Sequence, residues 1–459
     1  MSMDAVARRL DAVRQRWFVA VLLVLFTALS VQYTFKVLTH GTAIVRWMEQ
    51  LKHLESDDIF ERYNYPNPPI MALILSPLIN LPPLAAALLL FCMKVGMTLA
   101  VFYWVFRLVE VPQTLFPQWA KALAVLLSLR MIMSDLNHGN INLFILFLIV
   151  AALYAFHRRR DGVAGLVLAL AISCKVTPAL FVPYLIWKRA WKTLVACTVG
   201  LLLFLFCVPS LALGWDQNIR NLHSWVDGMI VPYVQEGKVT SEHQNQSLPG
   251  LVYRLTTHSP SFSTFDENDQ YIPSRYDNVV ALDPNQAQWI VRGCMALFPL
   301  LVLWTCRTSV TGRHGWRLAA EYSIVVLGML LFSERTWKHH AVTLVLPFAV
   351  VCYCLATRQF GWKMRSFLIA SLASASMLIA STSTLAAKES TPGLVHVWDQ
   401  IGKSAQVYGA FVWSYLLLLG ALVVLLRSKD HAASVVQSRV ADPGVVIDNP
   451  IRDASALSA

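Results

Sequence analysis

Residues 193–212 read TLVACTVGLLLFLFCVPSLA, an unbroken stretch without a charged side chain. A helix of this length measures about 30 Å, which matches the hydrocarbon layer of a membrane. Similar blocks recur through the chain of 459 residues, which is 56% hydrophobic and 14% charged. A soluble domain carries about a quarter charged residues. The composition therefore excludes an ordinary soluble enzyme and a nucleic-acid-binding protein, and it predicts an all-α polytopic membrane protein.

The apolar blocks are long enough to cross, or nearly cross, a bilayer. They are 17–36, 83–106, 122–133, 141–156, 162–173, 178–187, 193–212, 286–305, 318–332, 341–356, 366–386 and 407–426. Several are short for a span, so we expect about 10 to 12 transmembrane helices. A further block at 70–80 follows a proline cluster and is a candidate re-entrant segment. The cysteines have no metal-ligand spacing, and we expect no metal and no cofactor.

Basic residues mark every second loop along the chain. These loops are short and contain the segments 107–121, 158–160, 188–192, 307–317, 358–365 and 427–429. The positive-inside rule places them, with both termini, in the cytoplasm. We therefore expect a cytoplasmic N-terminus at 1–16, a transmembrane domain at 17–426 and a disordered cytoplasmic tail at 427–459. The net charge of +11 is thus a topology signal and does not indicate an acidic partner.

The other loops, predicted to face outside, carry unusual polar clusters. The long ones are 37–69, 213–285 and 387–406. The clusters read S-D-L-N-H-G-N-I-N (134–142), S-C-K-V-T-P (173–178), N-Q-S-L (245–248) and S-E-R-T-W-K-H-H (333–340). Charges at a membrane edge are costly unless they face a cavity or one another. We therefore predict a polar cavity that opens to the outside beneath the 213–285 loop.

The first outer loop contains an amphipathic stretch. Apolar residues recur at helical spacing through residues 44–60, which predicts a helix lying in the membrane interface. Such a helix would bring Asp57 and Asp58 to the height of the lipid headgroups. A solvated helix end explains the two acids equally well.

Three further candidates come from the polar clusters. Asp135 is explained either by a chemical role or by helix capping or an ion pair with Arg130. Lys175, before a proline between short apolar blocks, is typical of a broken helix that lines a cavity, where a lysine can hold a phosphate. Snorkelling to the interface is its alternative. His339 and His340 are candidates for phosphate binding or proton relay, and adjacent histidines are not expected to chelate one metal.

Taken in this order, the clusters resemble glycosyltransferase family 87 over roughly residues 17–426. The segments that carry the resemblance are Y-N-Y-P-N-P-P at 63–69, H-G-N-I-N-L at 138–143, K-V-T-P at 175–178, N-Q-S-L with Gly250 and Arg254, and Ser333, Trp337, His339, His340 and Pro347. Asn140 stands where the family usually has glutamine. Members of this family are multi-spanning enzymes with the GT-C fold that use polyprenyl-phosphate sugars, among them mycobacterial mannosyl- and arabinofuranosyltransferases.

The resemblance implies a GT-C-like bundle and a membrane glycosyltransferase. It would transfer a hexose from a polyprenyl-phosphate sugar to a glycan or glycolipid acceptor on the outer face of the cytoplasmic membrane, and mannose is the expected hexose. The implied donor and phosphate ligands are Lys175, His339, His340 and Arg254. The implied substrate-binding residues are Tyr63, Tyr65, Asn140, Asn142, Asn245, Gln246 and Trp337.

One departure from the family concerns the catalytic base. Members commonly carry an aspartate soon after the first span, whereas residues 38–42 here read L-T-H-G-T. Asp58 or Asp57 is the expected replacement, with Asp135 as the other candidate, unless the activity has diverged. An arabinofuranosyltransferase, a transporter or flippase of a lipid-linked sugar, and a non-catalytic scaffold are the alternatives. The one-sided polar clusters and the lack of an internal repeat favour the enzyme over the transporter.

Overall fold

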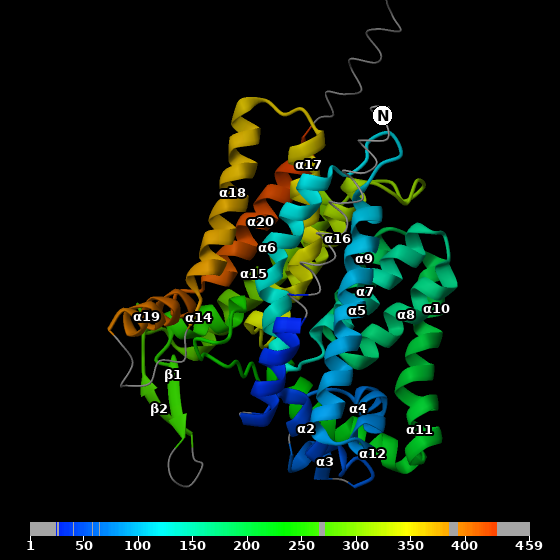
Figure 1. Cartoon of the computed structure of the whole chain (residues 1–459), viewed down its shortest axis with the longest axis vertical. Coiled ribbons are helices and arrows are strands. Elements are labelled where there is room, and N and C mark those ends of the chain that lie inside the picture. The colour runs from blue at the N-terminus through cyan, green and yellow to red at the C-terminus, as the bar shows by residue number, and fades with distance from the viewer. Residues whose placement is uncertain are drawn as a thin grey trace, which may run out of the picture.

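The computed structural model describes residues 24, 27–39, 41–56, 58–63, 65–265, 271–384 and 393–428, without the side chains of Asp58, Glu61 and Phe265. Most of this chain is helical, which confirms the predicted all-α class. Long helices form a bundle, and shorter helices and loops form a layer at one end, drawn at the bottom of Figure 1. We call it the loop layer. Its only described strands are β1 (Phe262–Phe265) and β2 (Tyr271–Arg275), an antiparallel hairpin.

Every predicted apolar block from residue 83 onward forms a helix of the bundle, and residues 27–36 of the first block are helical, in a helix that continues to residue 39. The bundle helices are α5 (Pro83–Val109), α6 (Gln118–His138), α7 (Asn142–His157), α8 (Asp161–Cys174), α9 (Phe181–Trp187), α10 (Trp191–Leu202), α11 (Val208–Leu213), α15 (Pro284–Thr305), α16 (Trp316–Leu331), α17 (Val345–Thr357), α18 (Trp362–Ser381) and α20 (Ala410–Arg427). By length and composition, 6 helical stretches of the described chain can each cross a membrane. The protein is therefore a multi-pass membrane protein.

The centre of the bundle is formed by α16, α17 and the 3-10 turn η5 (Lys338–Leu344) that precedes α17. In an 18-residue apolar window of the stretch 338–357, 78% of the residues are buried, against 17% in such a window of the stretch 191–213 on the outside of the bundle. The exposed apolar faces of the outer helices suit contact with lipid. The residues that follow α16 and precede α17 are thus held by the best-packed helices of the fold.

Two prolines account for two π-helical turns, in which the helix is wider than an α-helix. A π-helical turn, η3 (Leu203–Cys207), joins α10 to α11 just before Pro209, whose ring cannot coexist with an ordinary bond to the Leu205 carbonyl. The side-chain amide of Asn218 donates a hydrogen bond of 2.9 Å to that carbonyl. A second π turn, η4 (Val226–Ile230), precedes Pro232 in the same way. The polar backbone group released by Pro209 is therefore satisfied inside the apolar protein.

The basic loops gather at the end of the bundle opposite the loop layer. Arg159 donates to the carbonyl of Thr311 at 2.6 Å, and Arg313 forms a 2.6 Å ion pair with Asp161. Arg317 donates to the carbonyls of residues 426 and 428. These contacts bring three of the predicted basic loops together, as the alternation in sequence requires. The predicted N-terminal segment 1–16, and residues 429–459 of the tail predicted at 427–459, lie outside the described residues.

The loop layer is more helical than the sequence indicated. It contains α2 (Ala43–Leu51), α3 (Asp58–Glu61), α4 (Pro69–Leu75), η1 (Ser76–Asn80), α12 (Trp215–Trp225), α13 (Val231–Val234), α14 (Leu248–Thr256) and α19 (Gly393–Val407). The predicted amphipathic helix at 44–60 ends at Leu51. Its apolar residues Ile44, Trp47 and Leu51 are buried by protein, in contact with α5 and η1. The predicted amphipathic helix is thus present as α2, and its apolar face packs against protein in place of lipid.

Candidate active site

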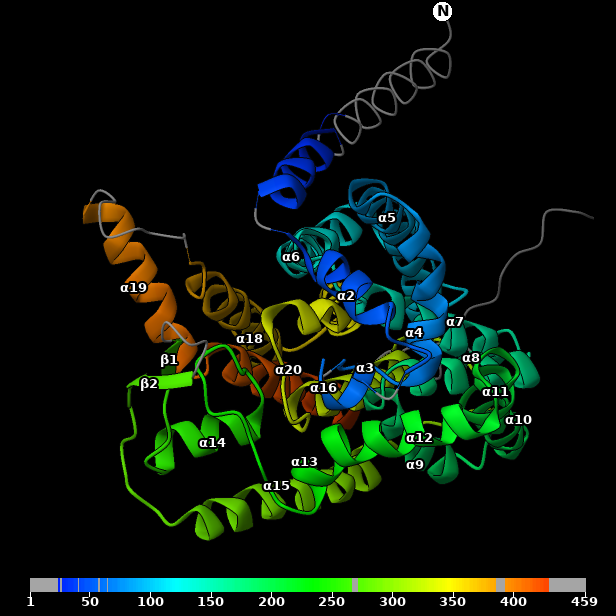
Figure 2. The ribbon, with the colours of Figure 1, turned by 90° about the horizontal axis from the view of Figure 1, so that it is seen from below.

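A cavity of about 750 Å³ opens in the loop layer, which Figure 2 views from below. Its walls come from α2, residues 66–68, the turn after α6, residues 175–177, the α12–α13 segment and residues 333–340. The volume lies within the range of about 300 to 1,000 Å³ that is usual for small-molecule sites. We call it the large cavity. Three clusters that the sequence singled out, at 134–142, 173–178 and 333–340, meet on its walls.

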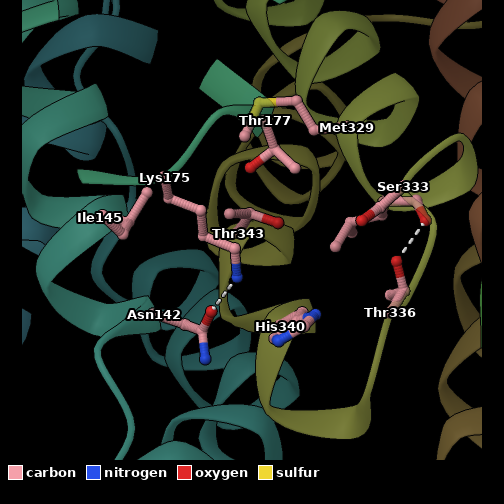
Figure 3. Close-up of a pocket in the computed structure, with 10 residues that line it drawn as sticks. Asn142, Ile145, Lys175, Thr177, Met329, Ser333, Thr336, His340 and Thr343 are labelled. Carbon is pink, nitrogen blue, oxygen red and sulfur yellow. Dashed lines mark hydrogen bonds between the residues drawn. The ribbon is translucent and has the colours of Figure 1, made fainter. Parts of the chain in front are cut away.

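Lys175 lies in this wall at the end of a chain of polar side chains. Its ammonium group donates to Oδ1 of Asn142 at 2.6 Å, and Nδ2 of Asn142 donates to Oδ1 of Asp135 at 3.0 Å. Oδ2 of Asp135 forms an ion pair of 2.8 Å with the buried Lys94. Figure 3 shows Lys175 reaching toward Asn142, with His340 beside them. Asp135 therefore fixes Asn142, and Asn142 in turn holds the ammonium group of Lys175.

The surroundings of Lys175 favour a negatively charged ligand. Burial lowers the pKa of Lys175 to about 8. An ammonium group has three donors, and one is taken by Asn142. The remaining donors are available to a ligand in the large cavity. A phosphate placed there would raise the pKa again, because the opposite charge favours the protonated lysine.

Asp135 does not line any of the described cavities. Its side chain is fully buried, and besides Lys94 and Asn142 it accepts a hydrogen bond from the backbone N–H of Leu143 at 3.3 Å. The ion pair is with Lys94 and not with Arg130, the partner considered from the sequence. Such a carboxylate has no access to an acceptor hydroxyl. The structure thus favours the ion-pair interpretation of Asp135 and gives it a positioning role.

The histidine pair is oriented by its neighbours. Oδ1 of Asn140 accepts from the N–H of Ile141 at 2.7 Å, so its Nδ2 faces His339 Nε2 at 3.1 Å as the donor. This contact places the ring proton of a neutral His339 on Nδ1. His340 Nδ1 faces the N–H of Trp337 at 3.3 Å, and the ring also makes a hydrogen bond to the backbone of Arg335. Both rings line the large cavity.

The turn that carries Asn140 depends on Gly139. This residue ends α6 with a φ of +69°, a conformation that side chains rarely adopt. A Cβ atom here would also lie 3.0 Å from Thr42 and from the hydroxyl of Tyr33. The glycine therefore allows the His138–Asn140 turn to lie against the chain that leaves the first span.

Arg254, Asn245 and Gln246 are not in the cavity, contrary to the ligand roles expected for them. All three are fully buried. Arg254 donates to the carbonyls of residues 241, 242, 245, 406 and 407 at 2.7–3.2 Å. Burial lowers its pKa to about 9. With its donors taken by backbone, the guanidinium group holds the loop layer together and cannot bind a phosphate.

The amides of the same element serve a related structural purpose. Asn245 donates to the carbonyls of Thr240 and Glu334 and accepts from the N–H of Thr336 at 2.9 Å. Gln246 donates to the carbonyls of His243 and Gln406. These bonds link the 240–246 loop to the segment before η5 and to the end of α19. Asn245 and Gln246 therefore hold parts of the loop layer together. The expectation that they contact substrate is corrected.

The two tyrosines of the first loop also lie away from the cavity. Tyr65 is fully buried and packs against Trp47 and Phe60, with ring centroids 6.0 and 6.2 Å away. Tyr63 stacks on His53 at 4.4 Å. Residues 66–68, which follow them directly, do line the large cavity. The tyrosines therefore support this wall from behind. Asp57 lies outside the described residues, and Asp58 is placed only as the first residue of α3.

Three charged residues of the large cavity were not expected. They are Arg46 from the polar face of α2, Lys238 from the loop after α13, and Glu334 from the segment before η5. Arg335, which precedes the predicted histidine pair, lines the cavity with them. Glu334 is the only acidic residue among those that line it in the described chain, and it accepts from the hydroxyl of Thr240 at 3.0 Å. No group of three or more potential metal ligands occurs in the described chain. In the sequence, the place of Arg46 on the polar face of the predicted helix at 44–60 was the one feature that could have identified it as a cavity residue.

Comparison with known proteins places the chain among glycosyltransferases. The model of the family "Glycosyltransferase family 87" matches residues 65–334, more than half of the chain. The polyprenol-phosphate-mannose-dependent alpha-(1-2)-phosphatidylinositol mannoside mannosyltransferase of Mycolicibacterium smegmatis is 25% identical over 307 residues, or 66% of this chain and 60% of its own length. The protein of the same name from Mycobacterium tuberculosis is 25% identical over 280 residues, or 60% of this chain and 55% of its own length.

The chain thus spans somewhat over half the length of these curated relatives. Among solved structures, ArnT from Cupriavidus metallidurans bound to undecaprenyl phosphate has a TM-score of 0.41 and 14% identity, over 88% of this chain and 77% of that chain. The family match contains residues 134–142 and 173–178, whose side chains form one wall of the large cavity. The chain belongs to glycosyltransferase family 87.

Proposed function

We propose that the protein is a membrane glycosyltransferase that uses a polyprenyl-phosphate sugar, mannose being the transferred sugar. The acceptor is a hydroxyl group of a glycan or glycolipid. The observation that carries this proposal is Lys175, held by Asn142 in the wall of a cavity that also presents Arg46, Lys238 and Arg335. A cavity with this excess of cations suits the phosphate of the donor. The names of the mannosyltransferase relatives support polyprenol-phosphate-mannose as the donor.

The reaction needs few groups. The acceptor oxygen attacks the anomeric carbon, its proton passes to a carboxylate, and the bond between the anomeric carbon and the phosphate oxygen breaks. The electron pair leaves with the polyprenyl phosphate. Lys175, with His340 beside it, donates hydrogen bonds to that phosphate as its negative charge grows, which stabilises the leaving group. His339, fixed by Asn140, and Trp337 line the same wall and orient the sugar.

We propose that the proton acceptor is one of three carboxylates. Asp58, the first residue of α3, and Asp57 are the candidates from the sequence. Glu334 is the candidate from the cavity wall. Replacing a catalytic base by its amide removes the proton acceptor and keeps the shape of the side chain, and general base catalysis contributes about 10²- to 10⁴-fold. One of the variants Asp57→Asn, Asp58→Asn and Glu334→Gln should therefore lose turnover by this factor.

The site is proposed to face the outside of the cytoplasmic membrane, with both termini inside. The basic loops support this orientation through the positive-inside rule. Reporter fusions test it. Alkaline phosphatase joined after residue 240 should be active in intact cells, and the same enzyme joined after residue 428 should be inactive. The reverse result would place the loop layer in the cytoplasm and overturn the orientation.

The activity is tested with purified protein in a single compartment. The protein in detergent is mixed with radiolabelled polyprenyl-phosphate mannose and a phosphatidylinositol mannoside, and lipid extracts are separated by chromatography. We expect labelled acceptor and free polyprenyl phosphate. Consumption of polyprenyl-phosphate arabinofuranose in place of the mannose donor would change the assigned sugar. No consumption of either donor, with movement of the intact donor across a proteoliposome membrane, would identify a transporter.

A further inference from the structure

Helix α19 (Gly393–Val407) lies between two membrane-spanning helices. The preceding helix α18 has 20 residues and the following helix α20 has 18, and each is long and apolar enough to cross a bilayer. Both helices contact α19, which Figure 1 shows lying crosswise to α18 at the edge of the bundle. Because a span ends where the hydrocarbon layer ends, α19 lies at the height of the membrane boundary.

One face of α19 is seated on the protein. Asp399 and Gln406 are buried, and the side chain of Gln406 donates to the carbonyl of Thr382 at 3.2 Å. Gly402 lies between them on the same face, where a Cβ atom would come within 2.3 Å of the carbonyl oxygen of Ser383. This close packing against the end of α18 fixes the rotation of α19 about its own axis.

At about 100° per residue, the rest of the surface of α19 divides into two sectors. One sector is polar and contains His396, Gln400, Lys403 and Ser404. The other is apolar, and its large side chains are between 52% and 87% exposed: Leu394, Val397, Trp398, Ile401 and, directly after the helix, Tyr408. Together with the protein-facing side, each sector takes up about a third of the circumference. Contact with protein and with water accounts for two of these three parts, so the apolar sector requires a third environment.

The apolar sector continues into the exposed surface of the span α20. The indole N–H of Trp413 donates to the carbonyl of Tyr408 at 3.0 Å, and Trp413 is itself 52% exposed on α20. Tryptophan and tyrosine are enriched where a membrane meets water, because their rings are apolar and carry one polar group. Trp398, Tyr408 and Trp413 are such residues at the end of a span. Their position indicates that phospholipid is the environment of this sector.

We propose that α19 is an interfacial helix, with its apolar sector inserted among the phospholipids of the leaflet on the loop-layer side. Such helices bury their apolar face about 5–10 Å into the boundary between headgroups and acyl chains. The polar sector then faces water, and the buried face holds the helix to the protein. Asp399 and Lys403 also line a cavity of about 480 Å³ beside η5, so the bilayer supports this wall of the cavity from its other side. The placement follows from the spans and does not depend on the proposed function.

Photolabelling from the lipid side tests this placement. The full-length protein is reconstituted in phosphatidylcholine nanodiscs in which a small fraction of the lipid carries a diazirine near the carbonyl end of its acyl chain, and labelled residues are located by mass spectrometry after irradiation. We expect labels on residues 394–401 of α19. Residues 44–51 of α2 are the matched comparison, since this helix is also amphipathic but its apolar residues are buried by protein, and their label should be at least tenfold weaker. A diazirine at the far end of the acyl chain should favour the stretch 191–213 over α19.

Two variants separate the sectors. Ile401→Glu places a negative charge in the apolar sector, and Gln400→Glu places the same charge one residue away in the polar sector. The label on residues 394–401 should fall at least fivefold in Ile401→Glu and stay unchanged in Gln400→Glu. The label on the stretch 191–213 should be the same in both, which checks folding and reconstitution.

Two results would overturn the proposal. One is the absence of label from residues 394–401 of the unaltered protein when the stretch 191–213 is labelled. Combined with a chemical cross-link between two copies through α19, that absence would assign the apolar sector to a second copy of the chain. The other is an equal label on residues 394–401 in Ile401→Glu and in the unaltered protein.

Discussion

Replacing Lys175 by methionine removes the ammonium group and keeps most of the length of the side chain. The structure gives this group one protein partner, Oδ1 of Asn142 at 2.6 Å, and leaves the others for the donor phosphate. A hydrogen bond between charged groups contributes about 1.5 to 3 kcal/mol, which corresponds to about 10- to 150-fold in a rate or binding constant. We therefore expect kcat/KM for the donor to fall by this factor in Lys175→Met, while KM for the acceptor stays the same.

The lowered pKa of Lys175 predicts that kcat/KM for the donor depends on pH. With its pKa lowered to about 8, Lys175 is charged below that pH and loses its charge above it. The value of kcat/KM should consequently fall about tenfold per pH unit above pH 8 in the free enzyme. An arginine stays charged throughout this range. Lys175→Arg should therefore be less active at pH 7, because its planar group fits the site differently, and should lack the decline above pH 8.

The assay is transfer from labelled polyprenyl-phosphate mannose at donor concentrations below KM, between pH 6 and pH 10. Lys192→Met, on an exposed lysine at the start of α10 and the opposite end of the bundle, is the matched control and should behave as the unaltered protein. An unchanged kcat/KM in Lys175→Met would refute the phosphate role of this lysine. A decline above pH 8 that persists in Lys175→Arg would show that another group titrates.

Three further substitutions test the supports of the site. Asp135→Asn leaves Lys94 buried without its counter-charge, so it should lower stability by about 3 to 5 kcal/mol in thermal unfolding, with a higher donor KM in whatever remains folded. Arg254→Gln removes bonds to backbone carbonyls of two segments, 241–245 and 406–407, and should lower the unfolding temperature, while donor KM in the folded fraction stays unchanged. A selective loss of donor affinity would restore its predicted phosphate role. Asn218→Ala leaves the Leu205 carbonyl unsatisfied and should cost about 1 to 3 kcal/mol, whereas the same change in a Pro209→Ala background should cost less.

The sequence alone was sufficient for the arrangement of spans. Apolar blocks and basic loops are local properties, and a bilayer imposes both, so the bundle helices between α5 and α20 lie where the blocks predicted them. Lys175 and the 333–340 cluster were found in the same way, because charges beside a span require a cavity or a partner. The family resemblance rested on these short clusters and is confirmed by the family match over residues 65–334.

Only the tertiary structure could decide what each polar residue touches. A buried arginine and a cavity arginine look alike in sequence, and Arg254 differs from Arg335 only through the carbonyls that surround it. Asp135 was ambiguous for the same reason, since its partner Lys94 is 41 residues away on another helix. The amphipathic residues 44–60 predicted an apolar face but not its neighbour, which is protein and not lipid. The hydropathy pattern indicates that a polar side chain beside an apolar segment needs a partner. Only the packing of helices that are distant in sequence determines which residue that partner is.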